Sequence, residues 1–342
     1  MGFEVMADDS GGRYNPTIDS LKGFLIVLVV VGHCITQSLA DNALRWAIYS
    51  FHMPVFIGLG GFLLNHNGLR SGGLSGIWRR YGTRVIVPWL ILFIAYTFMV
   101  HARDPLSLGL VADAILMPTY HTWYVPVFLF FVAIASFISR TALFPAMIVA
   151  TSIGAAVMIA FGMGNYPGIW PGKMSLDPRY FTMAPYFFFG LWLRQSGSLG
   201  AGRWGLGLAM VAGVAVEVCF FRHVDAVQII PNLLLNFALV STFPWLFSVN
   251  VRVPLLQLIG WNSLYFYLWH PFIIAISKRM FYKWLPEASA TLITVILIFV
   301  VMFIGLALIQ RSRLLLLVSG AQARRKNHPD APLAGQQRPL AG

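Results

Sequence analysis

Charged residues are scarce in this 342-residue chain. Only 11% of its residues are Asp, Glu, Lys or Arg, and 58% are hydrophobic, whereas a soluble globular protein carries about 25% charged residues. This composition excludes an ordinary soluble enzyme. The chain also lacks a polar stretch between Ile18 and Ile309 that is long enough to fold separately, so a single membrane-embedded domain is the simplest interpretation.

Acidic residues are the rarer charged class, and cysteine is nearly absent. The 24 Lys and Arg against 12 Asp and Glu give a formal net charge of +12. The basic residues lie in short connectors between apolar runs, as membrane proteins place them, so we expect contact with membrane lipids and no nucleic-acid partner. The two cysteines, Cys34 and Cys219, form neither a metal-binding spacing nor a disulfide framework.

Long apolar runs are abundant. A helix that crosses about 30 Å of hydrocarbon needs about 20 mostly apolar residues, and this criterion predicts an all-α, polytopic membrane protein with about ten transmembrane helices in one bundle. The first run is expected to be a retained span and not a cleaved signal, because the segment before it is long and acidic. The predicted spans are residues 18–37, 46–65, 85–101, 123–139, 141–161, 180–193, 204–221, 229–248, 255–276 and 290–309.

These runs divide the chain into three regions. We expect residues 1–17 to be a cytoplasmic N-terminal segment, residues 18–310 the transmembrane domain, and residues 311–342 a disordered, basic cytoplasmic tail. Assigning the 24 Lys and Arg to the two sides of ten spans places 16 on the side of the N-terminus and 8 on the other. Because basic connectors stay in the cytoplasm, both termini are predicted to be cytoplasmic.

Four histidines fall within or beside the predicted spans. His33 lies 11 residues beyond Lys22, or about 16 Å of helix rise, which places it just past the bilayer midplane. His52, His121 and His270 reach a similar depth from three other spans. An ionisable residue in a span is costly and indicates a functional site, although a single histidine near a helix end is more often a hydrogen-bonded structural residue. No histidine pair at i, i+4 and no nearby carboxylate supports a metal site, so no metal is expected.

Basic residues form a second group. Arg79, Arg80 and Arg84 precede the third span on the cytoplasmic side, and the i, i+4 spacing of the last two puts them on one helical face. Guanidinium groups match phosphate oxygens bidentately. The alternative is a plain topology anchor. Asp19 and Lys22, three residues apart, can pair at the start of the first span.

Five segments carry a resemblance to a known family. They are IDSLKGFLIVLVVVGH (residues 18–33), FHMPVFIGLGGFLL (51–64), RRYGTRVIVPWL (79–90), TWYVPVFLFF (122–131) and LIGWNSLYFYLWHPF (258–272). In this order they resemble successive motifs of the acyltransferase-3 family, on its fucose O-acetylase-like and exopolysaccharide-modifying side. One such segment is weak evidence, but five in order across nearly the whole membrane region are strong evidence.

The resemblance implies an O-acyltransferase with ten spans in a bacterial cytoplasmic (inner) membrane. Such an enzyme takes an acyl group from cytoplasmic acyl-CoA, most often acetyl-CoA, and places it on a hydroxyl of a carbohydrate or glycolipid at the outer side. The family's basic residue and histidine, separated by ten residues, correspond to Lys22 and His33, and its late-helix histidine to His270. Its cytoplasmic arginines correspond to Arg79, Arg80 and Arg84. The sequence departs from the family where Lys22 stands in place of the commoner arginine and where Gly60-Gly61 replaces Ser-Gly.

The implied chemistry needs a base. A sugar hydroxyl is a poor nucleophile at neutral pH, so a group must accept its proton as it attacks the thioester. His33 is the candidate base, and an acyl-histidine intermediate is the alternative. His270 or Tyr265 would orient the acceptor or stabilise the oxyanion. The expected catalytic set is His33, His270, Lys22 and Asp19, the expected CoA-binding set is Arg79, Arg80 and Arg84, and the expected acceptor-binding set is His52, His121, Trp123, Tyr124 and Tyr265.

A protein of another class has to be weighed beside this enzyme. A transporter or flippase for lipid-linked sugars also needs many spans and buried polar residues. An internal repeat of the helix pattern would favour it, and the sequence shows none.

Overall fold

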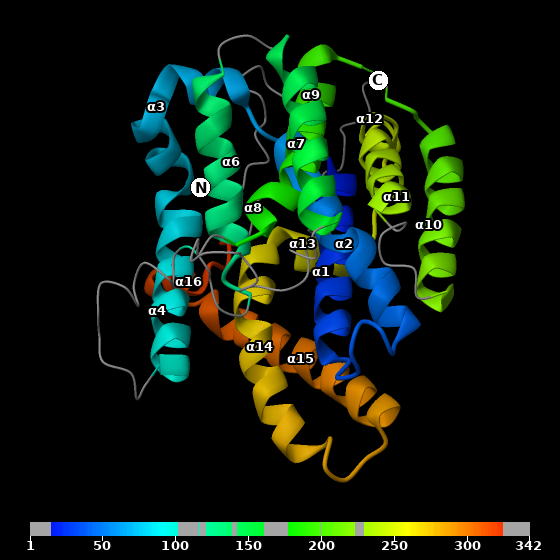
Figure 1. Ribbon diagram of the computed structural model, residues 1–342. Coiled ribbons are helices and arrows are strands. Elements are labelled where there is room, and N and C mark those ends of the chain that lie inside the picture. The colour runs from blue at the N-terminus through cyan, green and yellow to red at the C-terminus, as the bar shows by residue number, and fades with distance from the viewer. Residues whose placement is uncertain are drawn as a thin grey trace, which may run out of the picture.

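The computed structural model describes residues 15–101, 116, 121–138, 142–160, 177–198, 200–222 and 229–323. Every regular element in these ranges is a helix (Figure 1), which confirms the all-α class. The elements are α1 (Pro16–Cys34), α2 (Ala43–Phe62), α3 (His66–Tyr81), the π-helical turn η1 (Gly82–Ile86), α4 (Val87–His101), α6 (Tyr124–Phe137), α7 (Leu143–Ala160), α8 (Arg179–Thr182), α9 (Ala184–Ser196), α10 (Trp204–Arg222), α11 (Ile229–Ser241), α12 (Phe243–Leu246), α13 (Pro254–Trp261), α14 (Ser263–Met280), α15 (Glu287–Ile309) and α16 (Arg313–Ser319).

The expected count of about ten membrane spans is not confirmed. Within the described residues, five helices are long and apolar enough to cross a membrane, and a sixth results if α2 and the first half of α3, bent by 70° from each other, count as one span. Several expected spans are short or broken. Helix α6 has 14 residues and α9 has 13, and residues 255–276 are divided at Asn262 into α13 and α14. Hydropathy detects apolar runs but not the breaks inside them. The five candidates are Pro16–Cys34, Ser75–Met99, Trp204–Phe221, Ile229–Leu246 and Glu287–Ile309.

Two segments outside the expected spans are ordered as helices. Helix α3 occupies a connector, with a break at Gly73 where φ is 54°. Helix α16 lies in the region expected to be a disordered tail. There the indole of Trp269 donates to the carbonyl of Ser319 at 3.1 Å, and the backbone N–H of Gln322 donates to Asn262 Oδ1 at 2.9 Å. This part of the expected tail therefore lies against the bundle, where Ser319, Ala321 and Gln322 are buried. Residues 324–342 lie outside the described residues.

Helix α1 packs among α2, α13, α14 and α15. Its contact with α13 is close enough to require glycine on both sides. A Cβ at Gly23 would overlap the backbone carbonyl of Leu256, and a Cβ at Gly260 would overlap the backbone carbonyl of Asp19. Small residues allow helix backbones to approach in this way in membranes. This contact fixes the α1 segment that carries Lys22.

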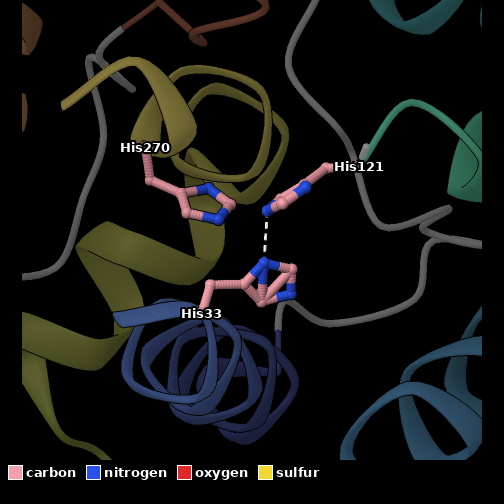
Figure 2. Close-up of side chains that lie close together, drawn as sticks. All are labelled: His33, His121 and His270. Atoms are coloured by element: carbon pink, nitrogen blue, oxygen red, sulfur yellow. Dashed lines mark hydrogen bonds between the residues drawn. The ribbon is translucent and has the colours of Figure 1, made fainter. Parts of the chain in front are cut away.

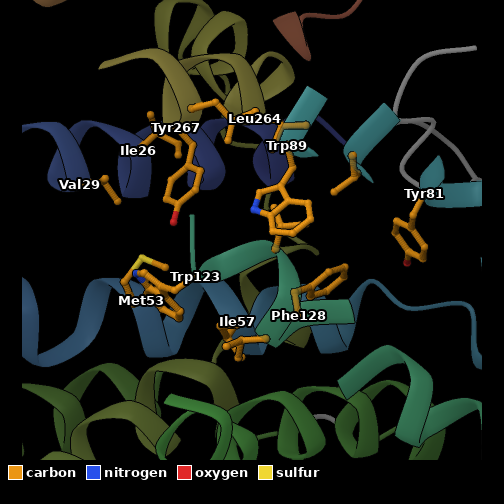
Figure 3. Packing of buried hydrophobic residues seen from close by; sticks show 14 of the residues in the cluster. Ile26, Val29, Met53, Ile57, Tyr81, Trp89, Trp123, Phe128, Leu264 and Tyr267 are labelled. Carbon is orange, nitrogen blue, oxygen red and sulfur yellow. The ribbon is translucent and has the colours of Figure 1, made fainter. Parts of the chain in front are cut away.

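The interior is one large apolar cluster, and the outer surface is also apolar. Figure 3 shows side chains from several helices packed together, among them Ile26, Ile57, Trp89 and Leu264. Helix α10 lies at one edge of the bundle (Figure 1) and exposes large apolar side chains, for example 69% of Val211. A soluble monomer rarely exposes such a continuous apolar face. The arrangement is that of an integral membrane protein.

Candidate active site

Two cavities open between the helices. The first, which we call the arginine cavity, has a volume of about 130 Å³ and is lined by Lys22, Arg80 and Arg84 together with apolar and aromatic side chains of α2, α6 and α14. The second, the histidine cavity, has a volume of about 1020 Å³, and its walls include His33 and His121. The basic and imidazole groups that the sequence singled out are thus divided between two chambers.

Tyr267 lines both cavities. On α14 it lies between Leu264, which faces the arginine cavity, and Ile274, which faces the histidine cavity. Residues three and four apart share a helix face, so α2 and α14 each present one continuous face to both chambers. The two cavities therefore adjoin along α2 and α14, and Tyr267 lies between them. Along α2 the lining residues run from the histidine cavity to the arginine cavity in the order Arg45, Tyr49, His52, Met53, Phe56, Leu59, Gly60 and Leu63.

Three imidazoles converge beside the histidine cavity (Figure 2). They belong to His33 near the end of α1, His121 in the turn before α6, and His270 in the middle of α14, and we call them the histidine cluster. Their ring centroids are 3.8 Å (His33 to His121), 4.8 Å (His121 to His270) and 5.4 Å (His33 to His270) apart. His33 Nδ1 and His121 Nε2 form a hydrogen bond. The cluster is assembled from three elements that are far apart in the sequence.

Backbone carbonyls fix the orientation of the cluster. His270 Nδ1 lies 2.9 Å from the carbonyl oxygen of Phe266, and because a carbonyl only accepts, Nδ1 carries the hydrogen and Nε2 carries the lone pair. His270 is fully buried, and its Nε2 has no hydrogen-bond partner among the described residues. The Tyr267 hydroxyl donates to the carbonyl of His121, and the Trp89 indole donates to the next carbonyl, that of Thr122, at 2.8 Å. These two donors hold the turn that carries His121.

Other residues of the histidine cavity lie around the cluster. His52 donates from Nδ1 to the carbonyl of Ile48 at 2.6 Å and lies outside the cluster, 5.1 Å from the ring of Tyr49. The Tyr49 ring in turn stacks on His33, with centroids 5.8 Å apart. The guanidinium of Arg45 lies 5.3 Å from the centroid of the Tyr49 ring. The ring of Tyr49 thus lies between His52 and the cluster.

A cation and its carboxylate partner complete one wall. Arg179 Nε donates to Asp177 Oδ1 at 2.7 Å, and the Arg179 guanidinium lies 4.4 Å from the centroid of the Trp123 ring. Trp123 lines the histidine cavity, whereas Tyr124 lines the arginine cavity. Asp177, Arg179 and Arg45 are not among the site residues that the sequence predicts. Their signal is weak because they lie in or beside connectors without a recognisable motif.

The basic residues predicted from the sequence do not all line the arginine cavity. Lys22 Nζ lies 3.1 Å from Asp19 Oδ1, and Asp19 is fully buried. Arg80 and Arg84 both line the arginine cavity, whereas Arg79 is exposed and does not. The π-helical turn η1 interrupts the α-helical i, i+4 geometry between Arg80 and Arg84, a kind of distortion that is frequent at functional sites.

Several expected site residues lie apart from the histidine cluster. Lys22 lines the arginine cavity, about 16 Å of helix rise from His33, and Asp19 is buried beside it as its ion-pair partner. The Tyr265 hydroxyl donates to the carbonyl of Met302 at 3.2 Å, in the contact between α14 and α15, and Tyr265 lines neither cavity. Its neighbour Tyr267 occupies the position facing both. The sequence alone does not show which of these two tyrosines on α14 faces the cavities, because it does not show how the helix is rotated about its axis.

The expectation that no metal binds depended on sequence spacing. The three imidazole nitrogens nearest one another, one from each residue of the cluster, all lie within 4.8 Å of one another. Ligands that come from three separate elements leave no spacing motif in a sequence. The spacing therefore gives no information about this cluster.

Comparison with known proteins decides the family. The acyltransferase domain that defines the acyltransferase-3 family matches residues 15–311. The chain belongs to the acyltransferase-3 family. Membership of a family of acyltransferases favours the enzyme over the transporter.

A second similarity covers only a small part of the chain. Over 81 residues the chain is 33% identical to nodulation protein NolL of Sinorhizobium fredii (strain NBRC 101917 / NGR234), a match that covers 22% of this chain and 22% of NolL. The chain thus spans about a fifth of the length of this relative. No solved structure matches the chain.

Proposed function

We propose that this acyltransferase moves an acetyl group from cytoplasmic acetyl-CoA to a hydroxyl of a carbohydrate at the outer side of the bacterial inner membrane. The acceptor is an exopolysaccharide, a lipid-linked sugar or an O-antigen-like glycan. The observation that carries the proposal is the pair of cavities that share Tyr267, one lined by Lys22, Arg80 and Arg84 and the other by His33 and His121. We propose that the two cavities form one path. The acyl donor and the acceptor lie on opposite sides of the membrane, and neither crosses the hydrocarbon freely. A path through the protein would let them meet.

The donor half of the reaction belongs to the arginine cavity. Arg80 and Arg84 would bind the CoA phosphates, since guanidinium groups form charge-assisted, bidentate hydrogen bonds to phosphate oxygens. Lys22, paired with Asp19, is a third basic residue in the lining. The cavity is small and otherwise lined mostly by apolar and aromatic side chains, which suits the thin pantetheine arm and would lead the thioester toward Tyr267.

The acceptor half belongs to the histidine cavity. Its volume of about 1020 Å³ lies near the upper end of the range typical of small-molecule sites and accommodates a sugar. Aromatic side chains such as Trp123 offer a stacking face, and His52 and Arg179 offer hydrogen bonds. His270 lies behind this lining, and the lone pair on its Nε2 faces the histidine cluster, so it would orient the acceptor through His33 and His121.

The transfer step requires a proton acceptor, and we assign that role to His33. As the hydroxyl oxygen attacks the thioester carbonyl, the proton passes to the imidazole, and when the tetrahedral intermediate collapses, it passes on to the departing CoA thiolate. The hydrogen bond between His33 and His121 fixes the ring and shares the positive charge that the proton brings. An acyl-histidine intermediate on His33 uses the same residues in two half-reactions.

The decisive experiment is mass spectrometry of surface polysaccharides and glycolipids. Cells without the protein should lose O-acetyl groups from one glycan, and re-expression of the wild type should restore them. His33→Gln should be produced in the membrane at normal levels and fail to restore them. Identical glycans with and without the protein would contradict the proposal.

A further inference from the structure

We propose that the histidine cluster is a binding site for Zn²⁺ and that the bound ion switches the enzyme off. One ring nitrogen each of His33, His121 and His270 lies within 4.8 Å of the other two. Figure 2 shows the three rings directed toward a common centre from three separate backbone segments. Three imidazoles and one open position form the usual donor set of an accessible zinc site.

His270 is held as a metal ligand is held. Its Nδ1–H donates to the carbonyl of Phe266, so the lone pair of Nε2 faces the cluster. That nitrogen belongs to a fully buried side chain and has no partner among the described residues. An imidazole whose second nitrogen donates to a backbone carbonyl is the arrangement found around protein-bound zinc. A buried lone pair without a donor is costly, and a metal ion would satisfy it.

His33 and His121 can supply the other two ligands without a change in charge. One of the two nitrogens that now share a hydrogen bond carries a hydrogen. When that hydrogen moves to the other nitrogen of its own ring, both lone pairs face the ion. Zinc–nitrogen bonds of 2.0–2.1 Å require ligand atoms about 3.3 Å apart in a tetrahedron, which side-chain adjustments within the cluster can reach. Water from the adjacent histidine cavity would fill the fourth position.

The donor set also selects the metal. Imidazole suits zinc and its neighbours in the first transition row, whereas magnesium and calcium require oxygen ligands. Asp177, the acidic residue in the wall of the histidine cavity, is engaged by the guanidinium of Arg179. The site is therefore expected to bind Zn²⁺ or Co²⁺ and to ignore Mg²⁺.

The inhibitory consequence rests on the proposed function. The ion would occupy the lone pairs of His33 and His270 that proton transfer and acceptor binding require. Metal binding and acyl transfer then exclude each other. Zinc in the compartment facing the histidine cavity would lower the transfer rate, and a chelator would restore it.

The test uses untagged, full-length protein in detergent, freed of metal by a chelator. Titration with Co²⁺ should give the visible absorption bands of a tetrahedral site with one ion per chain, and Zn²⁺ should displace them. His270→Gln should weaken binding by more than about 100-fold. The matched control is His66→Gln, because His66 is also buried and hydrogen-bonded to a carbonyl, that of Ala135 at 3.0 Å, but lies outside the cluster. This control should bind Co²⁺ as the wild type does.

Two results would overturn the inference in different ways. Absence of the cobalt bands, or equal binding by His270→Gln and wild type, would remove the site and leave the proposed function intact. Binding with the expected variant dependence, but with acyl transfer in membrane vesicles unaffected by Zn²⁺, would overturn the inhibitory role and the assignment of His33 as the base. Loss of transfer on addition of Zn²⁺ before acetyl-CoA, reversed by a chelator, would support both.

Discussion

At the scale of single residues, the roles of the imidazole nitrogens depend on which of them already form hydrogen bonds. The backbone carbonyl of Phe266 fixes the tautomer of His270, and the His33–His121 hydrogen bond fixes two more rings. The cluster is therefore preorganised before any substrate arrives. Preorganised polar groups contribute most where water is excluded, so small changes in these side chains should alter turnover more than stability.

His33 is the residue at which functional and structural roles diverge most clearly. If it is the base, His33→Ala should lower the transfer rate by about 10² to 10⁴ and leave CoA affinity nearly unchanged. His33→Gln should behave similarly, because an amide keeps a hydrogen bond to His121 but accepts no proton at neutral pH. Turnover, CoA titration and thermal unfolding of both variants decide the matter. A glutamine variant with near-normal turnover would move the base to His270.

Tyr267 joins the two cavities and holds the turn of His121. Tyr267→Phe keeps the ring at the junction and removes the hydrogen bond to the His121 carbonyl. We expect kcat to fall about tenfold, the equivalent of one hydrogen bond, with the affinity for CoA unchanged. Tyr265→Phe is the matched control, since that hydroxyl bonds the carbonyl of Met302 away from both cavities. Equal effects of the two substitutions on kcat would contradict the role given to Tyr267.

At the scale of helices, distortions and close contacts position the site. The π-helical turn η1 directs Arg80 and Arg84 into one cavity, and glycines bring α1 and α13 into backbone contact. Neither feature has a strong hydropathy signal. Both control where the ends of α1 and α4 lie, and so where the donor would bind.

The α1–α13 contact should be intolerant of side chains. Gly260→Leu introduces atoms where the backbone of Asp19 now lies, and overpacking of this kind costs about 1–3 kcal/mol or more. The variant should unfold at a lower temperature and lose CoA binding with the folded protein. Gly207→Leu on α10 is the control, because a Cβ there meets nothing within 4 Å. Equal thermal stability of both variants would show that the contact is not tight.

The arginine cavity should recognise phosphate. Arg80→Ala or Arg84→Ala removes charge-assisted hydrogen bonds, each worth about 1.5–3 kcal/mol, so the Kd for CoA should rise about 10- to 100-fold. Arg79→Ala is the control, since that side chain is exposed outside the cavity. Titrations with CoA and dephospho-CoA would identify the phosphate involved. Unchanged affinities for CoA in the Arg80 and Arg84 variants would contradict a role in CoA binding and would favour a role in setting the membrane topology.

At the scale of the whole molecule, function depends on which end of the path faces the cytoplasm. The N-terminal end of α1 is tied to the α12–α13 connector, where Thr17 Oγ1 donates to the carbonyl of Val249 at 2.6 Å. The opposite end of α1 leads to the histidine cluster. The charge asymmetry of the sequence predicts that the former lies in the cytoplasm, which would put the arginine cavity on the side of acetyl-CoA.

Cysteine labelling in intact cells tests this orientation. Ser38 in the α1–α2 connector and Ser248 in the α12–α13 connector are both exposed, whereas the natural cysteines, Cys34 and Cys219, are buried. A membrane-impermeant maleimide should label Ser38→Cys in intact cells and Ser248→Cys only after the membrane is opened. The reverse pattern would place the arginine cavity outside and refute a cytoplasmic donor.

The sequence by itself determined the class of the protein and the distances along single helices. Apolar composition requires a membrane-embedded helical protein, and a rise of about 1.5 Å per residue fixes the separation of Lys22 and His33 on α1. These properties are local, so no knowledge of neighbouring helices is needed. The break at Asn262 and the helical order of residues 313–319 depend on packing and could not be read in the same way.

Only the tertiary structure decided which residues meet. His33 and His121 are 88 residues apart in the chain and share a hydrogen bond. Arg79 and Arg80 are adjacent in the chain, but Arg79 is exposed and Arg80 lines the arginine cavity. Likewise Tyr267 lines both cavities and Tyr265 contacts α15. The physical reason is that helix geometry fixes neighbours within a turn, whereas the rotation of each helix about its axis is set by the side chains and glycines of the helices packed against it.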